Sequence, residues 1–257
     1  MIPRSFLISR APIISQMEFY VVLILVALLV GLSKGGMGAV LGVLVTPLLS
    51  LIMPVPTAIS LALPLLMIGD VFGLYFYWKT WDMHYVRLLL PVAIVGVLAG
   101  TYLLKTLDAV TLRHILAGFT LLFVAYKAAD KWLKALDYHP RNWHGYVAGA
   151  ASGLGSALAN AGSVPFTAYM LLQDVTPEVF AGTTTIYFAI INALKVPPFI
   201  SAGLIDLDSL VRVAWVLPFI PVGVYAARWI VKRIDQRAFE WVMLVVLVIA
   251  AAGLIFI

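Results

Sequence analysis

Apolar runs about as long as a bilayer is thick make up most of this sequence. A helix needs roughly 20 apolar residues to cross the hydrocarbon core, and the chain is little besides such runs joined by short polar segments. Of its 257 residues, 63% are hydrophobic and 11% are charged, with a mean hydropathy of +1.04. No soluble domain of this length hides so much apolar surface. The sequence therefore predicts an all-α polytopic membrane protein, embedded in the lipid bilayer and without a separate soluble domain.

Charge and motif content exclude several function classes. The net charge of +5 does not indicate a nucleic-acid partner, because the basic residues lie between the apolar runs, where membrane topology places them. Without cysteine the chain has no disulfide, thiolate metal site or thiol catalysis. The four histidines lack paired metal-ligand spacing, and no hydrolase or nucleotide-binding motif is present. We expect no enzyme, no metal and no cofactor.

The apolar segments form two similar sets on either side of a polar linker. The first set is 17–33, 38–53, 57–77, 85–104 and 111–129, and the second is 145–159, 161–173, 178–201, 209–229 and 238–257. The first two segments of each set are short for a span, and the other three are full length. Each set predicts a broken helix or re-entrant hairpin plus three full spans, and length alone leaves open whether the short pieces cross or turn back. The division is an N-terminal tail (1–16), repeat 1 (17–130), a cytoplasmic linker (131–144) and repeat 2 (145–257).

Matching residues recur in the same order in the two sets. They are Gly31 with Gly149, Pro47 with Pro165, Asp70 with Asn192, Asp82 with Asp206, Arg87 with Arg212, Gly96 with Gly223, and Asp108 with Asp235. Their offset drifts from 118 to 127 residues, as an old duplication predicts. Because each half crosses the bilayer an odd number of times, the second copy is expected upside down relative to the first. Loops on the linker's side hold ten of the 17 Lys and Arg residues and the other side holds five, which places the linker in the cytoplasm and both termini outside.

Two glycine-rich breaks are the candidate binding site. The first is the stretch GLSKGGMG from Gly31 to Gly38, and the second lies around 149–163. Non-helical backbone at membrane depth is tolerated only where protein buries it or a wet cavity satisfies it. A half-helix starting at 35–38 or 161–163 offers an anion its free N–H groups and the positive end of its dipole, and glycine permits close approach. The candidates at the breaks are Ser33, Gly35, Gly36, Gly38, Asn160, Gly162 and Ser163, with Ser152, Thr183, Thr184 and Thr185 as further donors.

Ionisable side chains inside the apolar segments are the second signal. Each costs at least about 2.5 to 3.5 kcal/mol on insertion scales, so it is a functional candidate. Lys34 lies at the first break, and Lys195 follows Asn192 by three residues on one helix face. Asp70 is the acidic residue well inside a span. Two cations against one carboxylate leave a positive surplus, which suits an anion.

Each candidate also has a purely structural interpretation. In this interpretation, Lys34 extends its side chain to the membrane surface, which requires the break to lie near an interface. Lys195 would form a static buried ion pair with Asp70. Asn192 only bridges two helices, and the glycines only allow close helix packing. The sequence does not decide between these interpretations and the functional one.

Specific residues resemble one known family. In the first half they are a G-x-x-x-G-x-x-G pattern followed by Pro47. In the second half they are Ala159 to Gly162 before Pro165, Tyr169 to Leu171, Phe180 to Thr184, Phe188, Asn192, Lys195, Pro197 and Gly203. Over nearly the whole chain the sequence resembles the sulfite exporter TauE/SafE family of membrane anion permeases. One departure is Ser163-Val164, which stands where a tighter Gly-Pro junction is expected.

The resemblance implies export of sulfite or a small organosulfonate such as sulfoacetate across a bacterial cytoplasmic membrane. Our hypothesis is a secondary transporter whose two halves rock around an anion held by Lys34, Lys195 and the backbone at 35–38 and 160–163. Asp70 would pair with a lysine in the empty site or carry a coupling proton. An anion channel and an importer of a small organic anion remain alternatives. Exact substrate, direction, coupling ion and oligomeric state are open at this point.

Overall fold

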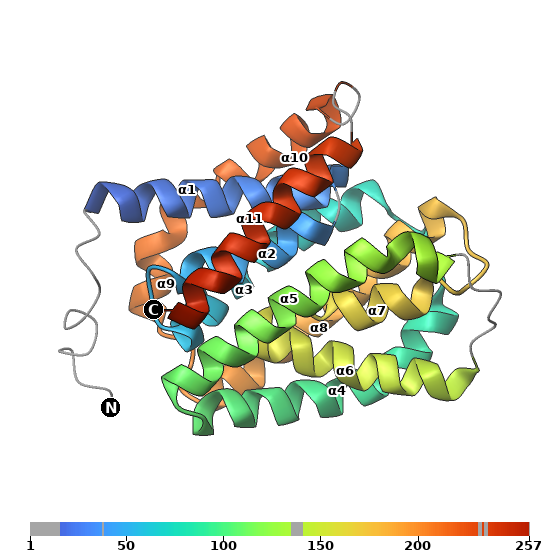
Figure 1. Ribbon diagram of the computed structural model, residues 1–257, viewed down its shortest axis with the longest axis horizontal. Coiled ribbons are helices and arrows are strands. Elements are labelled where there is room, and N and C mark those ends of the chain that lie inside the picture. The colour runs from blue at the N-terminus through green and yellow to red at the C-terminus, as the bar shows by residue number, and fades with distance from the viewer. Residues whose placement is uncertain (1–15, 38, 135–140, 231–232, 234–235, 257) are drawn as a thin grey trace.

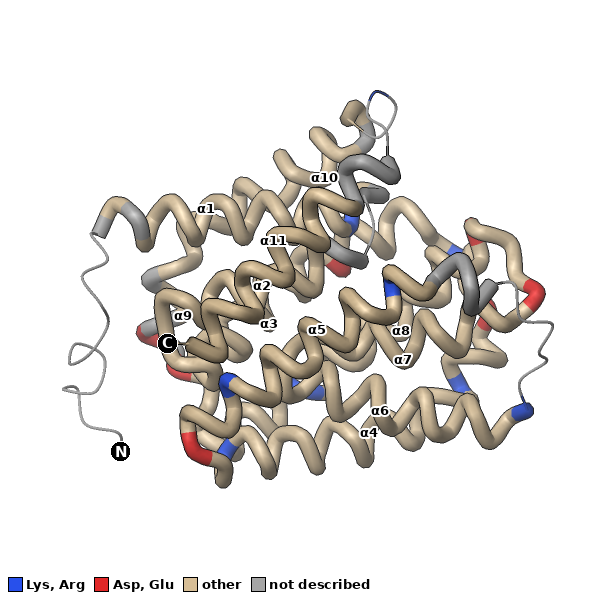
Figure 2. Tube along the Cα trace, in the orientation of Figure 1, with Lys and Arg blue, Asp and Glu red and all other residues tan. Residues whose placement is uncertain are grey.

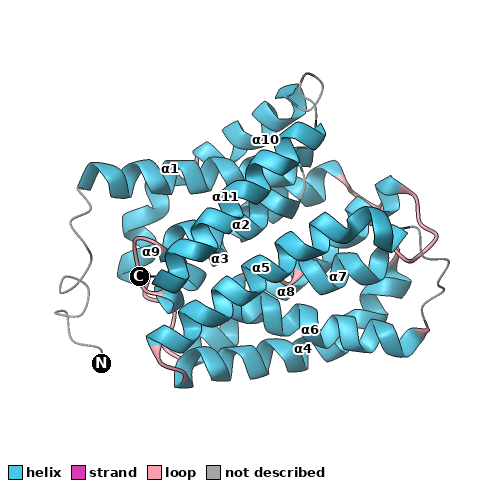
Figure 3. Cartoon of the chain, in the orientation of Figure 1, coloured by secondary structure: helices cyan, strands magenta, loops and turns pink. Residues whose placement is uncertain are grey.

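The computed structural model describes residues 16–256 except 38, 135–140, 231–232 and 234–235, and in this part of the chain it contains helices and no strands (Figures 1 and 3). The elements are α1 (Gln16–Leu32), a π-helix (Ser33–Met37), α2 (Ala39–Ser50), α3 (Val55–Phe76), α4 (Met83–Thr106), α5 (Ala109–Lys134), α6 (Asn142–Ala159), α7 (Ser163–Met170), α8 (Pro177–Ser201), α9 (Leu207–Val213), a 3-10 helix (Ala214–Val216), α10 (Phe219–Ile230) and α11 (Gln236–Phe256). The predicted helical class is confirmed.

Within the described part of the chain, four helices are long and apolar enough to cross a membrane: Val55–Phe76, Met83–Thr106, Ala109–Ala129 and Pro177–Ser201. They correspond to four of the six full spans expected from the sequence. Charged positions gather mainly at two opposite ends of the bundle, and the region between them is almost uncharged (Figure 2). This distribution is the one a bilayer requires, because charge is least costly outside the hydrocarbon core. The chain is a membrane protein.

In each half the two short helices form a hairpin. Leu23, early in α1, and Leu49, at the end of α2, belong to the same apolar cluster, so α2 returns toward the end at which α1 began. Likewise Gly145 at the start of α6 lies against Tyr169 at the end of α7, where an added Cβ would be 3.2 Å from the tyrosine ring. With 8 residues, α7 is about 12 Å long, too short to cross the core. The short segments of the second half therefore turn back.

The segment expected as a span at 209–229 is not one helix, which corrects the sequence-based prediction. It is divided into α9, the 3-10 helix and α10, and α10 begins at Phe219, directly after Pro218. Proline has no N–H to donate, and its ring collides with the carbonyl four residues earlier, here that of Ala214. Pro91 in α4 and Pro197 in α8 lie inside continuous helices, so proline alone did not mark this break.

The chain ends and the middle of the sequence lie at opposite ends of the bundle. Figure 1 shows the start of α1 and the end of α11 on the left, and the end of α5 and the start of α6 on the right. Each hairpin returns to its own side, so three helical passes remain per half. Each half thus connects one end of the bundle to the other.

Glycines allow two pairs of helices to pack with their backbones nearly touching. α1 runs along α10, where a Cβ on Gly31 would lie 2.1 Å from the Ile220 carbonyl oxygen. α6 runs along α4, where a Cβ on Gly153 would lie 2.0 Å from the Ala93 carbonyl oxygen. Real Cβ atoms do not approach so closely, so both contacts require glycine. These contacts hold each hairpin against a helix from the other half of the chain.

Loop carboxylates and hydroxyls start the long helices. The Asp82 side chain accepts a hydrogen bond from the His84 N–H at 2.8 Å, and Thr176 does the same for Val179 at 3.3 Å. Asp108, between α4 and α5, accepts from the Thr111 hydroxyl at 2.6 Å and from the Thr111 N–H at 2.9 Å. These hydrogen bonds hold the pKa of Asp108 below its ordinary value because they favour the charged carboxylate.

Candidate functional site

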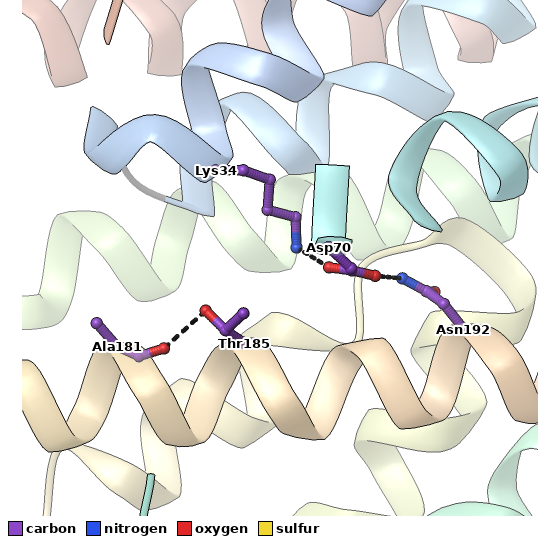
Figure 4. Close-up of polar contacts among 5 residues, drawn as sticks. All are labelled: Lys34, Asp70, Ala181, Thr185 and Asn192. Carbon is purple, nitrogen blue, oxygen red and sulfur yellow. Dashed lines mark hydrogen bonds and ion pairs between the residues drawn. The ribbon is translucent and has the colours of Figure 1, made fainter. Parts of the chain in front are cut away.

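A buried ion pair and an amide connect the first break to the long helix of the second half. Lys34 leaves the π-helix and points at Asp70 on α3, with 2.5 Å between Nζ and Oδ1 (Figure 4). The other carboxylate oxygen, Oδ2, accepts a hydrogen bond from Asn192 Nδ2 on α8 at 2.6 Å. Asp70 is thus held between a cation from one side and an amide from the other.

A second polar chain is centred on Lys195. Its ammonium group donates to Asn160 Oδ1 at 2.7 Å and to the Ser156 carbonyl at 3.3 Å. Asn160 Nδ2 in turn donates to Thr46 Oγ1 on α2 at 3.0 Å and to the Ile59 carbonyl on α3 at 3.4 Å. One side-chain amide therefore connects the tip of the α6–α7 hairpin to the α1–α2 hairpin.

Local backbone conformation explains how the two breaks present these side chains. The π-helix Ser33–Met37 adds a wide turn after α1, a feature that often occurs at functional sites. α6 ends at Asn160, whose φ of 51° is left-handed, and asparagine tolerates this conformation better than most residues. The Ser152 hydroxyl donates to the Gly162 carbonyl at 2.7 Å and fixes the turn between α6 and α7.

Charge and burial are unusual at this cluster. Among the described side chains, Asp70 and Lys195 are the charged ones that are fully buried, and Lys34 retains 19% of its side-chain exposure. Two amines meet one carboxylate, and that carboxylate is already engaged by Lys34 and Asn192. Because buried charge is costly without a partner, the cluster is suited to hold a small anion beside Lys195.

The ion pair differs from the alternative considered for the sequence. Lys34, and not Lys195, forms the salt bridge with Asp70. The Lys34 stem also lies over α3, where a Cβ on Gly69 would be 3.1 Å from Lys34 Cγ. Lys34 therefore points into the bundle and does not reach outward along it. Asn192 does bridge two helices, α8 and α3, as one alternative expected.

Several residues predicted for the anion site pack against other parts of the protein. A Cβ on Gly35 would be 2.5 Å from the Val224 carbonyl oxygen, and one on Gly162 would be 2.3 Å from that of Ser152. Helix backbone fills the space beside these glycines in this conformation. Gly36 lies in the π-helix and Ser163 opens α7, half-buried. Gly38 lies outside the described residues, and Ser33 lies in the π-helix with Gly36.

The threonines predicted as extra donors serve the protein itself. Thr183 Oγ1 accepts the Asp82 N–H at 2.9 Å and holds the loop before α4 against α8. Thr184 donates to the Phe180 carbonyl, and Thr185 donates to the Ala181 carbonyl at 2.8 Å (Figure 4). The hydroxyl hydrogens of Thr184 and Thr185 are therefore donated to carbonyl groups within α8.

Three contributors were not predicted. Thr46 and the Ser156 carbonyl complete the surroundings of Asn160 and Lys195, and neither carries a sequence signal of its own. The Tyr187 hydroxyl is fully buried and lies near Ser152, yet no described group meets hydrogen-bond geometry with it. Tyr187 precedes Lys195 by eight residues, about two helical turns of α8. This spacing could have predicted from the sequence that Tyr187 lies on the same side of the helix as Lys195.

Comparison with known proteins gives one match. A family model described as Sulfite exporter TauE/SafE matches residues 23–254, nearly the whole chain. The matched region contains the first hairpin from residue 23 onward, the whole second hairpin and every side chain of the polar cluster. No curated protein matches, and no solved structure matches.

Proposed function

Because the chain belongs to the TauE/SafE family of sulfite exporters, which are membrane transporters, we propose that it moves a small sulfur-containing anion across a bacterial cytoplasmic membrane by alternating access. Sulfite and small organosulfonates such as sulfoacetate are the proposed substrates, and export is the proposed direction. The proposed site is the cluster formed by Lys34, Asp70, Asn160, Asn192 and Lys195.

The observation that carries this proposal is the imbalance of charge in the buried cluster. Lys195 is fully enclosed and hydrogen-bonds to two neutral oxygens. The carboxylate that could balance it is held by Lys34 at 2.5 Å and by Asn192 at 2.6 Å. A sulfur oxyanion supplies both negative charge and several acceptor oxygens. Lysine suits such a ligand because it acts as a point charge without demanding one geometry.

Two inverted repeats would provide the moving parts. Several contacts support this arrangement, because residues that match between the halves meet in space. Asp70 bonds to Asn192, its counterpart in the other half. Gly31 packs on α10, and Gly149, its counterpart, packs on α4, the counterpart of α10. Rocking of one half against the other around such contacts is the mode expected of inverted-repeat transporters.

In this mechanism the hairpin tips open and close the site. Asn160 contacts Thr46 and Lys195 at the same time, so separation of the hairpins breaks these contacts and admits an anion. The incoming anion takes the place of Asn160 at Lys195, and Asp70 keeps Lys34 neutralised between turnovers. Because several weak contacts hold the anion, and not one tight cage, it can leave the site again.

Flux through purified protein in liposomes tests the proposal. Vesicles preloaded with unlabelled sulfite or sulfoacetate are expected to accumulate labelled anion by counterflow, whereas sulfate and acetate compete weakly. Lys195→Ala and Lys34→Ala are expected to lower this counterflow at least tenfold, and Lys105→Ala, an exposed lysine in the last turn of α4, is the matched control.

Two results would contradict the proposal in different ways. Normal counterflow in both lysine variants would show that the site lies elsewhere. Currents that rise linearly with anion concentration, without counterflow, would identify a channel in place of a carrier.

A further inference from the structure

We propose that Lys195 binds a proton together with the transported anion and releases both on the other side, so that the protein is an anion–proton cotransporter. This inference rests on the proposed function, and it adds the coupling ion and the residue that carries it. Export then runs down the anion's own concentration gradient and stops where that gradient balances the inward proton gradient. The proton forms a third N–H bond at Lys195 Nζ when the anion enters. It returns to water when the anion departs.

The hydrogen bonds of Lys195 fit a neutral amine. A neutral amine has two N–H groups, and the described surroundings offer Lys195 two acceptors, Asn160 Oδ1 at 2.7 Å and the Ser156 carbonyl at 3.3 Å. An ammonium group has three N–H groups, and its third would meet no acceptor among the described residues. A bound anion that replaces Asn160 offers several oxygens, so it accepts from two of the three N–H groups and also supplies the opposite charge.

The surrounding charges do not hold a proton on Lys195 permanently. The charged groups whose fields act on it are Asp70 on α3, which attracts the charge, and Lys34 on the π-helix, which repels it. Asp70 and Lys34 form a salt bridge with each other, so their effects at Lys195 oppose each other. The other titratable side chains on the helices packed against α8 are Tyr75 on α3, His84, Tyr85, Arg87, Tyr102 and Lys105 on α4, His144 and Tyr146 on α6, and Tyr169 on α7.

The two lysines therefore have different roles. Lys34 has a carboxylate partner, Asp70, with which it forms a salt bridge. Lys195 has no carboxylate partner and is fully removed from solvent, so carrying a charge through the empty-state transition is unfavourable. Losing the proton with the anion lets the empty carrier reorient without an unbalanced buried charge.

The test uses sulfoacetate, because this anion carries no titrating proton near neutral pH, whereas bisulfite would move protons itself. In liposomes with equal potassium on both sides and valinomycin, the membrane potential is held at zero. An imposed pH gradient, acid outside, is expected to drive sulfoacetate inward above its equilibrium concentration. A pH-sensitive dye inside the vesicles is expected to record about one proton per anion.

Lys195→Arg keeps the positive charge but cannot release the proton. We expect it to retain sulfoacetate counterflow and to lose accumulation driven by the pH gradient. Lys105→Arg is the matched control, because this exposed lysine is not part of the cluster, and it is expected to keep both activities. If Lys195→Arg fails to fold, the proton count of the wild-type protein still decides the matter.

The outcomes separate the two proposals. Sulfoacetate flux by the wild-type protein without proton movement would overturn the coupling proposal and leave the transport function intact. Full pH-driven accumulation by Lys195→Arg would also overturn it. Absence of any sulfoacetate or sulfite flux would instead contradict the proposed function itself.

Discussion

Asp70 and Asn192, which occupy matching positions in the two halves of the sequence, are hydrogen-bonded to each other, with 2.6 Å between Oδ2 and Nδ2. One half supplies a carboxylate at this position and the other supplies an amide. If two carboxylates met here, they would repel each other in a buried site. Asparagine at position 192 thus allows the two helices to meet, and it leaves a single negative charge to balance Lys34.

Replacing Asp70 by Asn is expected to lower both stability and transport. The variant leaves the Lys34 amine without its carboxylate in a mostly buried setting, at a cost of about 1–3 kcal/mol, less than for a fully buried pair because Lys34 is partly exposed. Thermal unfolding in detergent and sulfite counterflow measure the two effects. A double-mutant cycle with Lys34→Met is expected to give a coupling energy of about 1 kcal/mol or more. Additive effects would mean that the pair does not act as a unit.

Asn160 lends itself to a matched pair of substitutions. Its φ of 51° suits glycine and penalises alanine. Both Asn160→Gly and Asn160→Ala remove the amide contacts to Lys195 and Thr46 and are expected to lower counterflow strongly. Asn160→Ala is expected to be less stable than Asn160→Gly by about 1 kcal/mol, because only alanine is strained in the left-handed conformation. If Asn160→Gly transports like the wild type, the side-chain amide of Asn160 does not belong to the proposed site.

The large features of the fold follow from patterns that depend on local sequence. Segment length and hydropathy identified the membrane class, and the glycine-rich stretches marked where α1 and α6 end. Four of the expected full spans are continuous helices of sufficient length. The break before α10 was missed because Pro218 resembles Pro91 and Pro197, which lie inside continuous helices. Whether proline interrupts a membrane helix depends on which neighbours satisfy the freed carbonyl groups.

The partners of individual side chains were harder to predict from the sequence than the helices were. Lys34 and Lys195 were equally plausible partners for Asp70, because the choice depends on how α3 and α8 are rotated in the bundle. Thr46 became a partner of Asn160 only because the tip of the α6–α7 hairpin lies against α2. Lys34 and Asp70 are 36 positions apart and Thr46 and Asn160 are 114 apart, and neither periodicity nor spacing encodes such contacts.

Tyr187 is expected to contribute to anion binding and not to stability. Its hydroxyl is buried near Ser152 without a hydrogen-bond partner among the described residues, and such a group is unfavourable unless it is used in another state. Tyr187→Phe is therefore expected to unfold at the same temperature as the wild type or higher. Its apparent affinity for sulfite is expected to fall roughly tenfold, as the loss of one hydrogen bond to a charged ligand predicts. Tyr102→Phe, at an exposed tyrosine of α4, is the control, and equal affinities for the two variants would assign Tyr187 to packing alone.

The backbone contacts between helices make a final prediction about glycine. A Cβ on Gly153 would lie 2.0 Å from the Ala93 carbonyl oxygen, and one on Gly31 would lie 2.1 Å from that of Ile220. Because both obstacles are backbone atoms, neither can move aside without separating the helices, and Gly153→Ala and Gly31→Ala are each expected to destabilise the protein by about 1–3 kcal/mol.

Gly118 in α5 provides the comparison, since nothing lies within 4 Å of its added Cβ. Gly118→Ala is expected to stabilise the protein by about 0.5–1 kcal/mol, as alanine does in a helix where space allows. Thermal unfolding of the three variants in detergent measures these differences. A Cβ on Gly149, the counterpart of Gly31, would lie 2.4 Å from the Leu89 carbonyl oxygen. If the two halves are related by inversion, Gly31→Ala and Gly149→Ala should also slow counterflow to a similar degree, because each would disturb one of two equivalent contacts between a hairpin and the opposite half. Loss of transport in one variant together with normal transport in the other would show that the two hairpins do not move as equivalents.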